Sequence, residues 1–330
     1  LGGTAVRRGY RYIPSEIRTE TIAVSGGDAE KAKVLITDRG PIFGPAFDGP
    51  FGALSMSATL LRPSALGAPL HLGRVRSFDE FRTLFREWPS VPLNVGYADE
   101  RGVGWQLIGE APVRGRGGGT IPQDASDRDT AWRPERITTA ELPHTENPAC
   151  GFVATANNLP STDQYLGSDF LDGYRLARIS ELLAGRRDWD VAAALRMQLD
   201  QHSLPWREMR ETVLGASAND PSPAAGLLRS WDGNVAAGSV GAAVFELFAT
   251  DLARRVAEAR APHSARFALG AGFTPLVPFN GLVVRRISHL ASLLRTQPPG
   301  WFAEGWDDAI RASIRNAATT VFTPATAQTL

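Results

Sequence analysis

The stretch GFVATANNLP, residues 151–160, is the part of this sequence that says most about the fold. Its small and apolar residues up to Ala156 predict a short buried strand, and Asn157 and Asn158 follow where that strand would end. An asparagine N–H at the end of a buried strand can point into a cleft and donate a hydrogen bond to a developing oxyanion. The plainer interpretation is that the two asparagines turn the chain, and the stretch alone leaves both interpretations open.

A second stretch, YRLARI at residues 174–179, places Arg175 and Arg178 about one turn apart at the start of a predicted helix. Two guanidinium groups so placed can bind a carboxylate or orient another side chain through a bidentate fork. Arginines at this spacing also form ordinary ion pairs on solvated helix faces. The stretch therefore predicts a helix but does not by itself assign a function to either arginine.

Two further stretches are structural when taken alone. YADERGVGW at residues 97–105 predicts a hairpin with an acidic turn, whose glycines supply the positive φ that a turn requires. LRSWDG at residues 228–233 predicts a helix end, with the glycine as the stop and the tryptophan as a packing anchor. His202 and Asp200 lie close in the sequence, but no GxSxG motif accompanies them, so a Ser–His–Asp triad is not expected.

Strands are predicted mainly in the first half of the chain. Residues 19–24 and 33–38 alternate polar and apolar side chains around a Ser-Gly-Gly-Asp turn, which indicates a hairpin. Residues 53–61 form a continuous run of apolar and small side chains, which indicates a strand covered on both faces. Further strands are expected at residues 93–98, 103–108 and 151–156. A loop rich in Gly and Asp is expected at residues 114–129.

Helices are predicted mainly in the second half, apart from residues 78–88, where aromatic and aliphatic side chains recur at helical spacing after Ser77. Ser168 and Asp169 are expected to cap a helix that Gly185 ends. Later helices are expected from Ser239 onwards, at residues 287–294 and at residues 306–317. Strands first and helices last argue for an α+β fold. Three parts are expected: a β-rich segment at residues 1–50, part of the core at residues 51–200, and a mainly helical region at residues 201–330.

The composition makes several classes of partner unexpected. The 330 residues are 43% hydrophobic and 21% charged, and 35 basic residues balance 35 acidic ones. Without a basic excess, neither nucleic acid nor an anionic membrane surface is an expected partner. No apolar run reaches about 18 residues, so no membrane span is expected. Cys150 is the only cysteine and the five histidines lack metal-ligand spacing, so neither an internal disulfide nor a structural zinc site is expected.

In this order and at these separations, the four stretches resemble the β-chain of penicillin acylases. That family shows an acidic-turn hairpin that continues to a Gly, a Pro and an Arg, matched here from Tyr97 to Arg114. Its Gly-x-x-x-x-x-Asn-Asn-x-Pro, Tyr-Arg…Arg-Ile and Leu…Trp-Asp-Gly segments are matched at residues 151–160, 174–179 and 228–233. The early TDRGP resembles a T-x-H-G-P strand of the family, with Arg39 in place of the histidine.

The resemblance implies an αββα sandwich of the N-terminal-nucleophile hydrolase superfamily. This chain would be an internal fragment of it, with a β-rich N-terminal part and a helical C-terminal part. In the family, self-cleavage makes a serine the new N-terminus, and its own α-amino group, with a pKa of about 8, serves as the base. The implied substrates are small N-acyl amides: β-lactam side chains, acyl-homoserine lactones or lipopeptide acyl groups. The implied partners are the remaining segments of the same precursor, namely the α-chain and the nucleophile-bearing N-terminus of the β-chain.

The resemblance also implies a set of site residues. Asn157 matches the oxyanion-hole asparagine of the family, and Arg175 matches an arginine that orients the site near the nucleophile. Ala58 falls where some members have a pocket tryptophan, and Leu93 falls at an aliphatic wall, so a roomier acyl pocket is expected. Asp169 matches a calcium-ligating aspartate whose companion carboxylates lie upstream of this chain, so a structural calcium is implied. No organic cofactor is expected.

The main departure from the family is the missing nucleophile, because the Gly/Ser-Asn-x-Trp junction at which that serine lies does not occur in this sequence. The leading hypothesis is therefore one portion of an amidohydrolase whose serine comes from another segment, so that this chain alone is inactive. The alternatives are a catalytically inactive acylase-like module for binding or assembly, and an unrelated α+β enzyme. The upstream sequence distinguishes the first two, and a structure distinguishes the third. Nothing in the sequence indicates where the protein is located.

Overall fold

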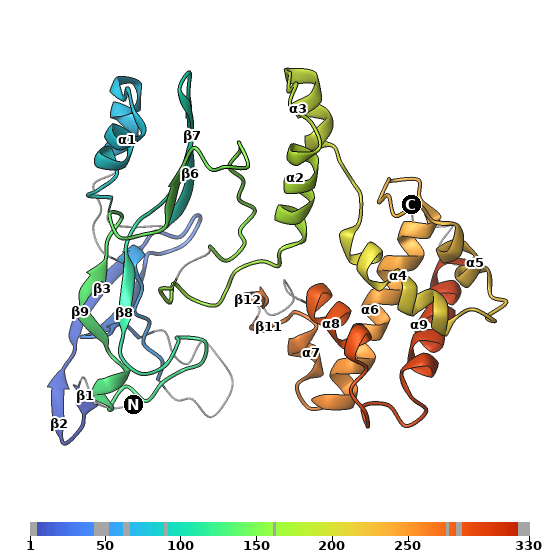
Figure 1. Ribbon diagram of the computed structural model, residues 1–330. Helices are drawn as coiled ribbons and strands as arrows, with labels where there is room; N and C mark the ends of the chain where they lie inside the picture. Colours follow the sequence, from blue (N-terminus) through green and yellow to red (C-terminus); the bar gives the residue numbers. More distant parts are fainter. Residues whose placement is uncertain are drawn as a thin grey trace. The chain divides into compact units, whose positions relative to one another are not determined.

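A computed structural model describes residues 5–42, 53–61, 67–88, 92–160, 163–274, 277–281 and 286–322 (Figure 1). The chain forms two compact units, of which the first comprises Leu1–Thr155 and Leu159–Phe170. The second comprises Ala156–Asn158 and Leu171–Leu330. The three-part division expected from the sequence is not tested by these units and stays a prediction.

The first unit consists of short antiparallel strands with one short helix. Its strands are β1 (Ala5–Arg8), β2 (Arg11–Pro14), β3 (Glu16–Ile22), β4 (Glu30–Thr37), β5 (Gly40–Pro41), β6 (Leu93–Asp99), β7 (Gly102–Ile108), β8 (Ala111–Arg114), β9 (Trp132–Ile137) and β10 (His144–Glu146). Its helices are α1 (Phe78–Leu84) and the 3-10 turns η1 (Thr59–Leu61), η2 (Ala68–Arg74) and η3 (Arg128–Thr130). The strands pair in the orders β1-β2, β3-β4-β5, β10-β7-β6 and β8-β9.

Three local predictions in this unit are confirmed. Strands β3 and β4 form the expected hairpin, in register from Glu16 opposite Ile36 to Ile22 opposite Glu30. Strands β6 and β7 form the acidic-turn hairpin. Helix α1 begins after Ser77, whose side chain accepts a hydrogen bond from the Glu80 N–H, and it packs its aromatic face into a small core. Because each feature depends on periodicity and turn chemistry within a few residues, local sequence was sufficient to predict it.

Two predicted strands are wrong. Residues 53–61 form an isolated bridge between Ser55 and Ile42 and then the turn η1, and Leu60 and Leu61 are exposed rather than covered. That run contains a single β-branched residue, so its apolar character did not carry β-propensity. Residues 151–156 are not part of a ladder either, because the described structure pairs this region only at an isolated parallel bridge between Asn158 and Leu171. Propensity favours an extended backbone but does not supply a partner strand.

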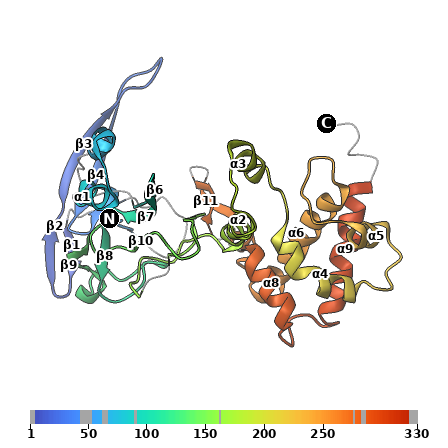
Figure 2. The same ribbon diagram turned by 45° about the horizontal axis from the view of Figure 1, so that its top comes forward.

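The second unit is helical apart from one small hairpin, as Figures 1 and 2 show. Its elements are α2 (Tyr174–Ala184), α3 (Val191–Gln198), α4 (Leu204–Ala216), α5 (Pro223–Ser230), α6 (Val240–Arg260), α7 (Ala265–Ala268), β11 (Ala271–Thr274), β12 (Val277–Phe279), α8 (Arg286–Thr296) and α9 (Trp306–Phe322). Helix α6 packs along α9 and against α5 and α8, and the shared core includes Trp206, Phe245 and Ile310. None of the helices in the described ranges combines the length and apolar character needed to cross a membrane.

Of the two helix starts predicted for this unit, one is confirmed and one is wrong. Ser239 caps α6 as expected, and its side chain accepts a hydrogen bond from the Ala242 N–H. The cap predicted at Ser168 and Asp169 is wrong, because α2 begins only at Tyr174 after Gly173. The acidic residue nearer to this start is Asp172, whose pKa is raised by burial and lowered in part by the Tyr174 N–H. This later start places Arg175 in the first turn of α2.

Candidate active site

Asn157 lies in the second unit, on a short segment that precedes α2. Its backbone has a φ of 59°, in the left-handed region that asparagine tolerates better than most residues. The Leu171 N–H donates to the Asn157 carbonyl at 2.8 Å, and Asn158 forms a parallel bridge with Leu171. The segment is thus attached by its backbone to the residues that lead into α2.

Arg175 determines how the Asn157 amide points. Its Nη2 donates to the Ala156 carbonyl and to the Asn157 Oδ1, both at 2.7 Å. Because a guanidinium has only donors, the amide atom that faces it must be the oxygen. The Asn157 Nδ2 therefore points away from Arg175, and within the described chain no group accepts a hydrogen bond from it. The Asn157 side chain is exposed, so these two N–H bonds are available to a ligand.

Asn158 has the other function considered for this pair. Its Oδ1 accepts a hydrogen bond from the Ala156 N–H at 3.1 Å, which closes a tight local turn. The two asparagines are therefore not equivalent. Asn158 stabilises the turn, and Asn157 presents its amide. The turn interpretation applies to Asn158, and the oxyanion assignment of Asn157 stays a prediction.

Arg178 is engaged in an ion pair. Its Nε and Nη2 donate to the two Asp200 carboxylate oxygens at 2.8 and 2.7 Å, and Nη1 also reaches Glu181 at 3.3 Å. The hydrogen bonds from Arg178 lower the pKa of Asp200, against the opposing effect of burial. Arg178 therefore ties α2 to the loop that follows α3. Of the two predicted arginines, only Arg175 meets the asparagine.

Hydrogen bonds of Tyr174 also hold α2 in place. Its hydroxyl donates to Glu208 on α4, and Arg295 on α8 donates to the other oxygen of Glu208 at 3.0 Å. Burial, followed by the hydrogen bond and charge of Glu208, raises the pKa of the Tyr174 phenol. The tyrosine is therefore a neutral donor at ordinary pH. The start of α2, and with it Arg175, is held on both sides by polar contacts within the second unit.

A histidine-based triad is not formed around His202. Asp200 is occupied by Arg178, and His202 forms an isolated bridge with Asn234 through its backbone. The neighbouring Ser203 accepts a hydrogen bond from the Trp206 N–H as the cap of α4. These contacts give all three residues structural functions, in agreement with the expectation from sequence.

Asp169 lies in the first unit, where it is exposed and accepts a hydrogen bond from the Ser168 hydroxyl at 3.4 Å. Among the described residues, no group of three or more His, Cys, Asp or Glu side chains is placed to hold a metal ion. Calcium requires six to eight oxygen ligands, of which Asp169 would supply at most two. The calcium ligand assignment stays a prediction that depends on carboxylates from elsewhere in the protein.

The two predicted acyl-pocket residues also lie in the first unit. Ala58 is half-buried and lines a groove of about 890 Å³. Leu93 begins β6, is 45% exposed, and is not among the residues that line this groove. Their pocket functions stay predictions. The sequence indicated Arg39 and Arg114 only as positions of family motifs and assigned no arginine to a groove with Ala58, although the RGRGGG run at residues 114–119 and Trp132 were visible signals.

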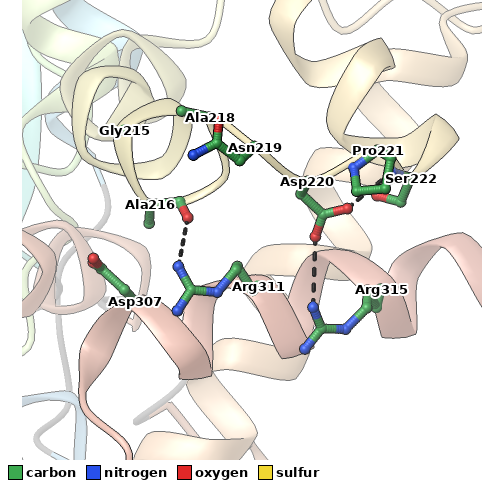
Figure 3. A pocket seen from close by; sticks show the side chains of 10 residues that line it. All are labelled: Gly215, Ala216, Ala218, Asn219, Asp220, Pro221, Ser222, Asp307, Arg311 and Arg315. Carbon is green, nitrogen blue, oxygen red and sulfur yellow. Dashed lines mark hydrogen bonds and ion pairs between the residues drawn. The ribbon is translucent and has the colours of Figure 1, made fainter.

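A separate pocket of about 560 Å³ lies between the α4–α5 loop and α9 (Figure 3). Asp220 is buried there, accepts a hydrogen bond from the Ser222 N–H at 2.9 Å, and lies 3.6 Å from Arg315. Burial acts to raise the pKa of Asp220, but Ser222 and the charges of Arg315 and Arg229 lower it below its ordinary value. Arg311 donates to the Ala216 carbonyl at 2.9 Å. These balanced charges fasten the loop to α9.

Comparison with known proteins connects this geometry to a family. The sequence profile described as penicillin amidase matches residues 2–329. The acyl-homoserine lactone acylase QuiP of Pseudomonas fluorescens Pf-5 is 26% identical over 270 residues, which cover 74% of this chain and 33% of that protein. The penicillin acylase 2 proenzyme of Pseudomonas sp. SE83 is 26% identical over 339 residues, which cover 94% of this chain and 41% of that protein. The chain thus spans about a third to two fifths of these relatives.

A solved structure is similar over almost the whole chain. The thermostable penicillin G acylase from Alcaligenes faecalis matches 98% of this chain and 64% of its own, with a TM-score of 0.75 and 18% sequence identity. At that identity the likeness concerns the fold. It confirms the expected α+β class and the expected relation to the acylase sandwich.

Proposed function

Because this chain belongs to the penicillin amidase family, we propose that the protein it is part of hydrolyses the amide bond of N-acyl compounds. The serine nucleophile would come from a segment outside this chain. The observation that carries the proposal is the contact between Arg175 and Asn157, which fixes the amide oxygen and leaves the amide N–H bonds free. An oxyanion hole requires such a preoriented donor.

The chemistry follows from what each group can do. The serine hydroxyl attacks the carbonyl carbon and gives its proton to the α-amino group, so negative charge develops on the carbonyl oxygen. Asn157 Nδ2 donates to that oxygen. Collapse of the intermediate breaks the C–N bond, and the leaving amine takes the proton from the α-amino group. Water then releases the acyl group from the serine. Arg175 acts through Asn157 and is a positioning residue.

We propose a class of substrates and not a single compound. The relatives are named for acyl-homoserine lactones and for penicillins, which share an acyl group bound to an amine through one amide. β-Lactam side chains, acyl-homoserine lactones and lipopeptide acyl groups all remain candidates. An inactive acylase-like module is the competing hypothesis, but it gives no reason for an arginine to hold an asparagine amide in this orientation.

The experiment uses the full-length protein and a panel of N-acyl 4-nitroanilides, with wild type, Asn157→Ala and Asn219→Ala. Removing the oxyanion donor should lower kcat on the order of 10²- to 10³-fold, since one such donor is worth about 3–4 kcal/mol in the transition state. Asn157→Ala should also lower the free energy of unfolding by about 1 kcal/mol, because alanine tolerates the left-handed φ of 59° less well than asparagine, so kcat is taken per folded molecule. Asn219 is an exposed loop asparagine of the same unit, and its variant should keep wild-type kcat.

Two results would reject the proposal in different ways. Wild-type protein that cleaves none of the amides would favour the inactive module. Wild-type protein that cleaves them while Asn157→Ala retains full kcat would keep the amidase activity but remove Asn157 from the oxyanion hole.

A further inference from the structure

The pocket between the α4–α5 loop and α9 contains a buried carboxylate oxygen that accepts no hydrogen bond from the described residues. The Asp220 side chain is 4% exposed, and its Oδ1 accepts from the Ser222 N–H at 2.9 Å. Its Oδ2 is shielded from solvent and lies 3.6 Å from Arg315 Nη1, which is beyond hydrogen-bonding distance. A buried oxygen without a donor costs free energy, so a ligand that donates a hydrogen bond to Oδ2 would be stabilised there.

Asp220 is a fixed, charged acceptor. Burial opposes its ionisation, but Ser222 and the positive charges of Arg315 and Arg229 hold the pKa of Asp220 below its ordinary value. Arg229 also donates to the backbone carbonyls of Ser217 and Asp220 at 3.2 and 3.4 Å, which holds the loop in place. The group that this carboxylate can bind is therefore a hydrogen-bond donor, and a cationic donor would bind most strongly.

The side of the pocket formed by α9 presents a guanidinium group. Arg315 is 57% exposed, and within the described ranges it donates no hydrogen bond. Arg311, four positions earlier on the same helix face, is already engaged with the Ala216 carbonyl at 2.9 Å and with Asp308 at 2.7 Å. Arg315 therefore has donors available for a carboxylate, which it can bind through two parallel hydrogen bonds.

A ligand with a single charge would meet a like charge in this pocket. A lone ammonium at Asp220 would lie beside Arg315, and a lone carboxylate at Arg315 would lie beside Asp220, because the two side chains are 3.6 Å apart. A zwitterion gives each side chain an opposite charge. In an α-amino acid the ammonium and the carboxylate are bonded to the same carbon, so they lie close enough together to meet these two neighbouring side chains at once.

The remaining lining leaves space for an amino-acid side chain. Figure 3 shows Asp220 and Arg315 facing each other between the loop and α9. Small side chains line the pocket beside them, at Gly215, Ala216 and Ala218. The volume of about 560 Å³ lies within the range of small-molecule sites.

We propose that this pocket binds a free α-amino acid. The ammonium of the ligand donates to Asp220 Oδ2, and its carboxylate accepts hydrogen bonds from Arg315, whose exposed side chain moves to admit the ligand. Neither Asn157 nor Arg175 lines this pocket. The inference therefore goes beyond the proposed amidase function and does not depend on it.

The test is calorimetric titration of the full-length protein with L-alanine, ethylamine and propionate. Ethylamine is alanine without the carboxylate, and propionate is alanine without the ammonium. L-Alanine should bind at least about tenfold more tightly than either, the effect expected of one charge-assisted hydrogen bond. β-Alanine has the same two charges farther apart, and it should bind at least about tenfold more weakly than L-alanine.

Two variants test the two charged side chains. Arg315→Gln should weaken L-alanine binding at least about tenfold and should bind ethylamine at least as tightly as the wild type does, because a repulsive charge is removed. Asp220→Asn should also weaken L-alanine binding, and Arg315→Gln serves if Asp220→Asn does not fold. Arg210→Gln is the matched control, since Arg210 is an exposed arginine of α4 that does not line the pocket, and its variant should keep the wild-type affinity.

Three results would overturn the proposal. The first is no detectable binding of L-alanine. The second is ethylamine or propionate binding as tightly as L-alanine, which would indicate a site for a single charge. The third is L-alanine affinity that is lost in Asn157→Ala but kept in Arg315→Gln, which would place the amino acid at the candidate active site. None of these measurements involves turnover, so the amidase proposal is tested separately.

Discussion

At the scale of single residues, the second unit has residues that present free polar groups and others that stabilise the fold. Asn157 offers an amide whose oxygen is occupied by Arg175 and whose N–H bonds are free within the described chain. Asn158 stabilises the turn, and Arg178 is paired with Asp200. Residues of identical type, one or three positions apart, thus differ because their partners lie elsewhere in the chain. A functional interpretation of any one of them depends on those partners.

Arg175 should affect the rate through the orientation of Asn157. We expect Arg175→Ala to lower kcat on the order of 10²-fold, the effect of a misplaced catalytic group, while KM changes much less. The kcat of Arg175→Lys should lie between those of Arg175→Ala and the wild type, because an ammonium donates hydrogen bonds but lacks the planar fork. Steady-state kinetics with one amide substrate checks both. A rise in KM without a loss of kcat would show that Arg175 contacts substrate and does not position Asn157.

At the scale of elements, α2 is fastened to its unit by ion pairs and hydrogen bonds more than by apolar packing. None of its side chains is fully buried, whereas Arg178 bonds to Asp200, Tyr174 to Glu208 and Arg207 to Glu181. Ion pairs and hydrogen bonds of this kind fix the position of the helix, and their contribution to stability depends on pH. Helix α6, in contrast, has ten buried residues and depends on the core.

The Arg178–Asp200 pair should make the stability of the protein depend on acid. The folded pKa of Asp200 is depressed by Arg178, so its contribution is present above the unfolded pKa of about 4 and is lost as pH falls below it. Asp200→Asn should therefore destabilise by about 1–2 kcal/mol at pH 6 and by much less near pH 3. Denaturant unfolding at both pH values measures this. Asp188→Asn removes a carboxylate side chain that is 84% exposed, so it should show little effect at either pH. Equal destabilisation by Asp200→Asn at both pH values would contradict the assignment.

At the scale of the whole molecule, each unit has its own core. The first unit buries aromatic residues of α1 against β7, and the second surrounds α6 with α4, α5, α8 and α9. Asn157 and Arg175 both belong to the second unit, so their contact does not depend on the first. The groove that Ala58 lines belongs entirely to the first unit. Stability and chemistry can therefore be perturbed separately.

Phe245→Ala should destabilise the second unit without changing its chemistry. Phe245 is 1% exposed and packs against Trp206 and Trp231 with ring centres 5.4 Å apart. Its removal should cost about 3–5 kcal/mol, while kcat per folded molecule stays at the wild-type value. Denaturant midpoints measure the loss of stability, and initial rates at 25 °C measure kcat. Glu246→Ala, an exposed neighbour on α6, should change the free energy of unfolding by no more than about 0.5 kcal/mol.

The sequence by itself determined the β3–β4 hairpin, the capped helices α1 and α6, and the order of motifs that indicated the family, because each depends on contacts within a few positions. Only the tertiary structure decided that Arg175 meets Asn157 while Arg178 meets Asp200, and that arginines from positions 8 to 136 line one groove. It also decided that residues 53–61 and 151–156 lack a ladder. Local preferences choose a backbone conformation, but partners far along the chain are chosen by the packing of the whole unit.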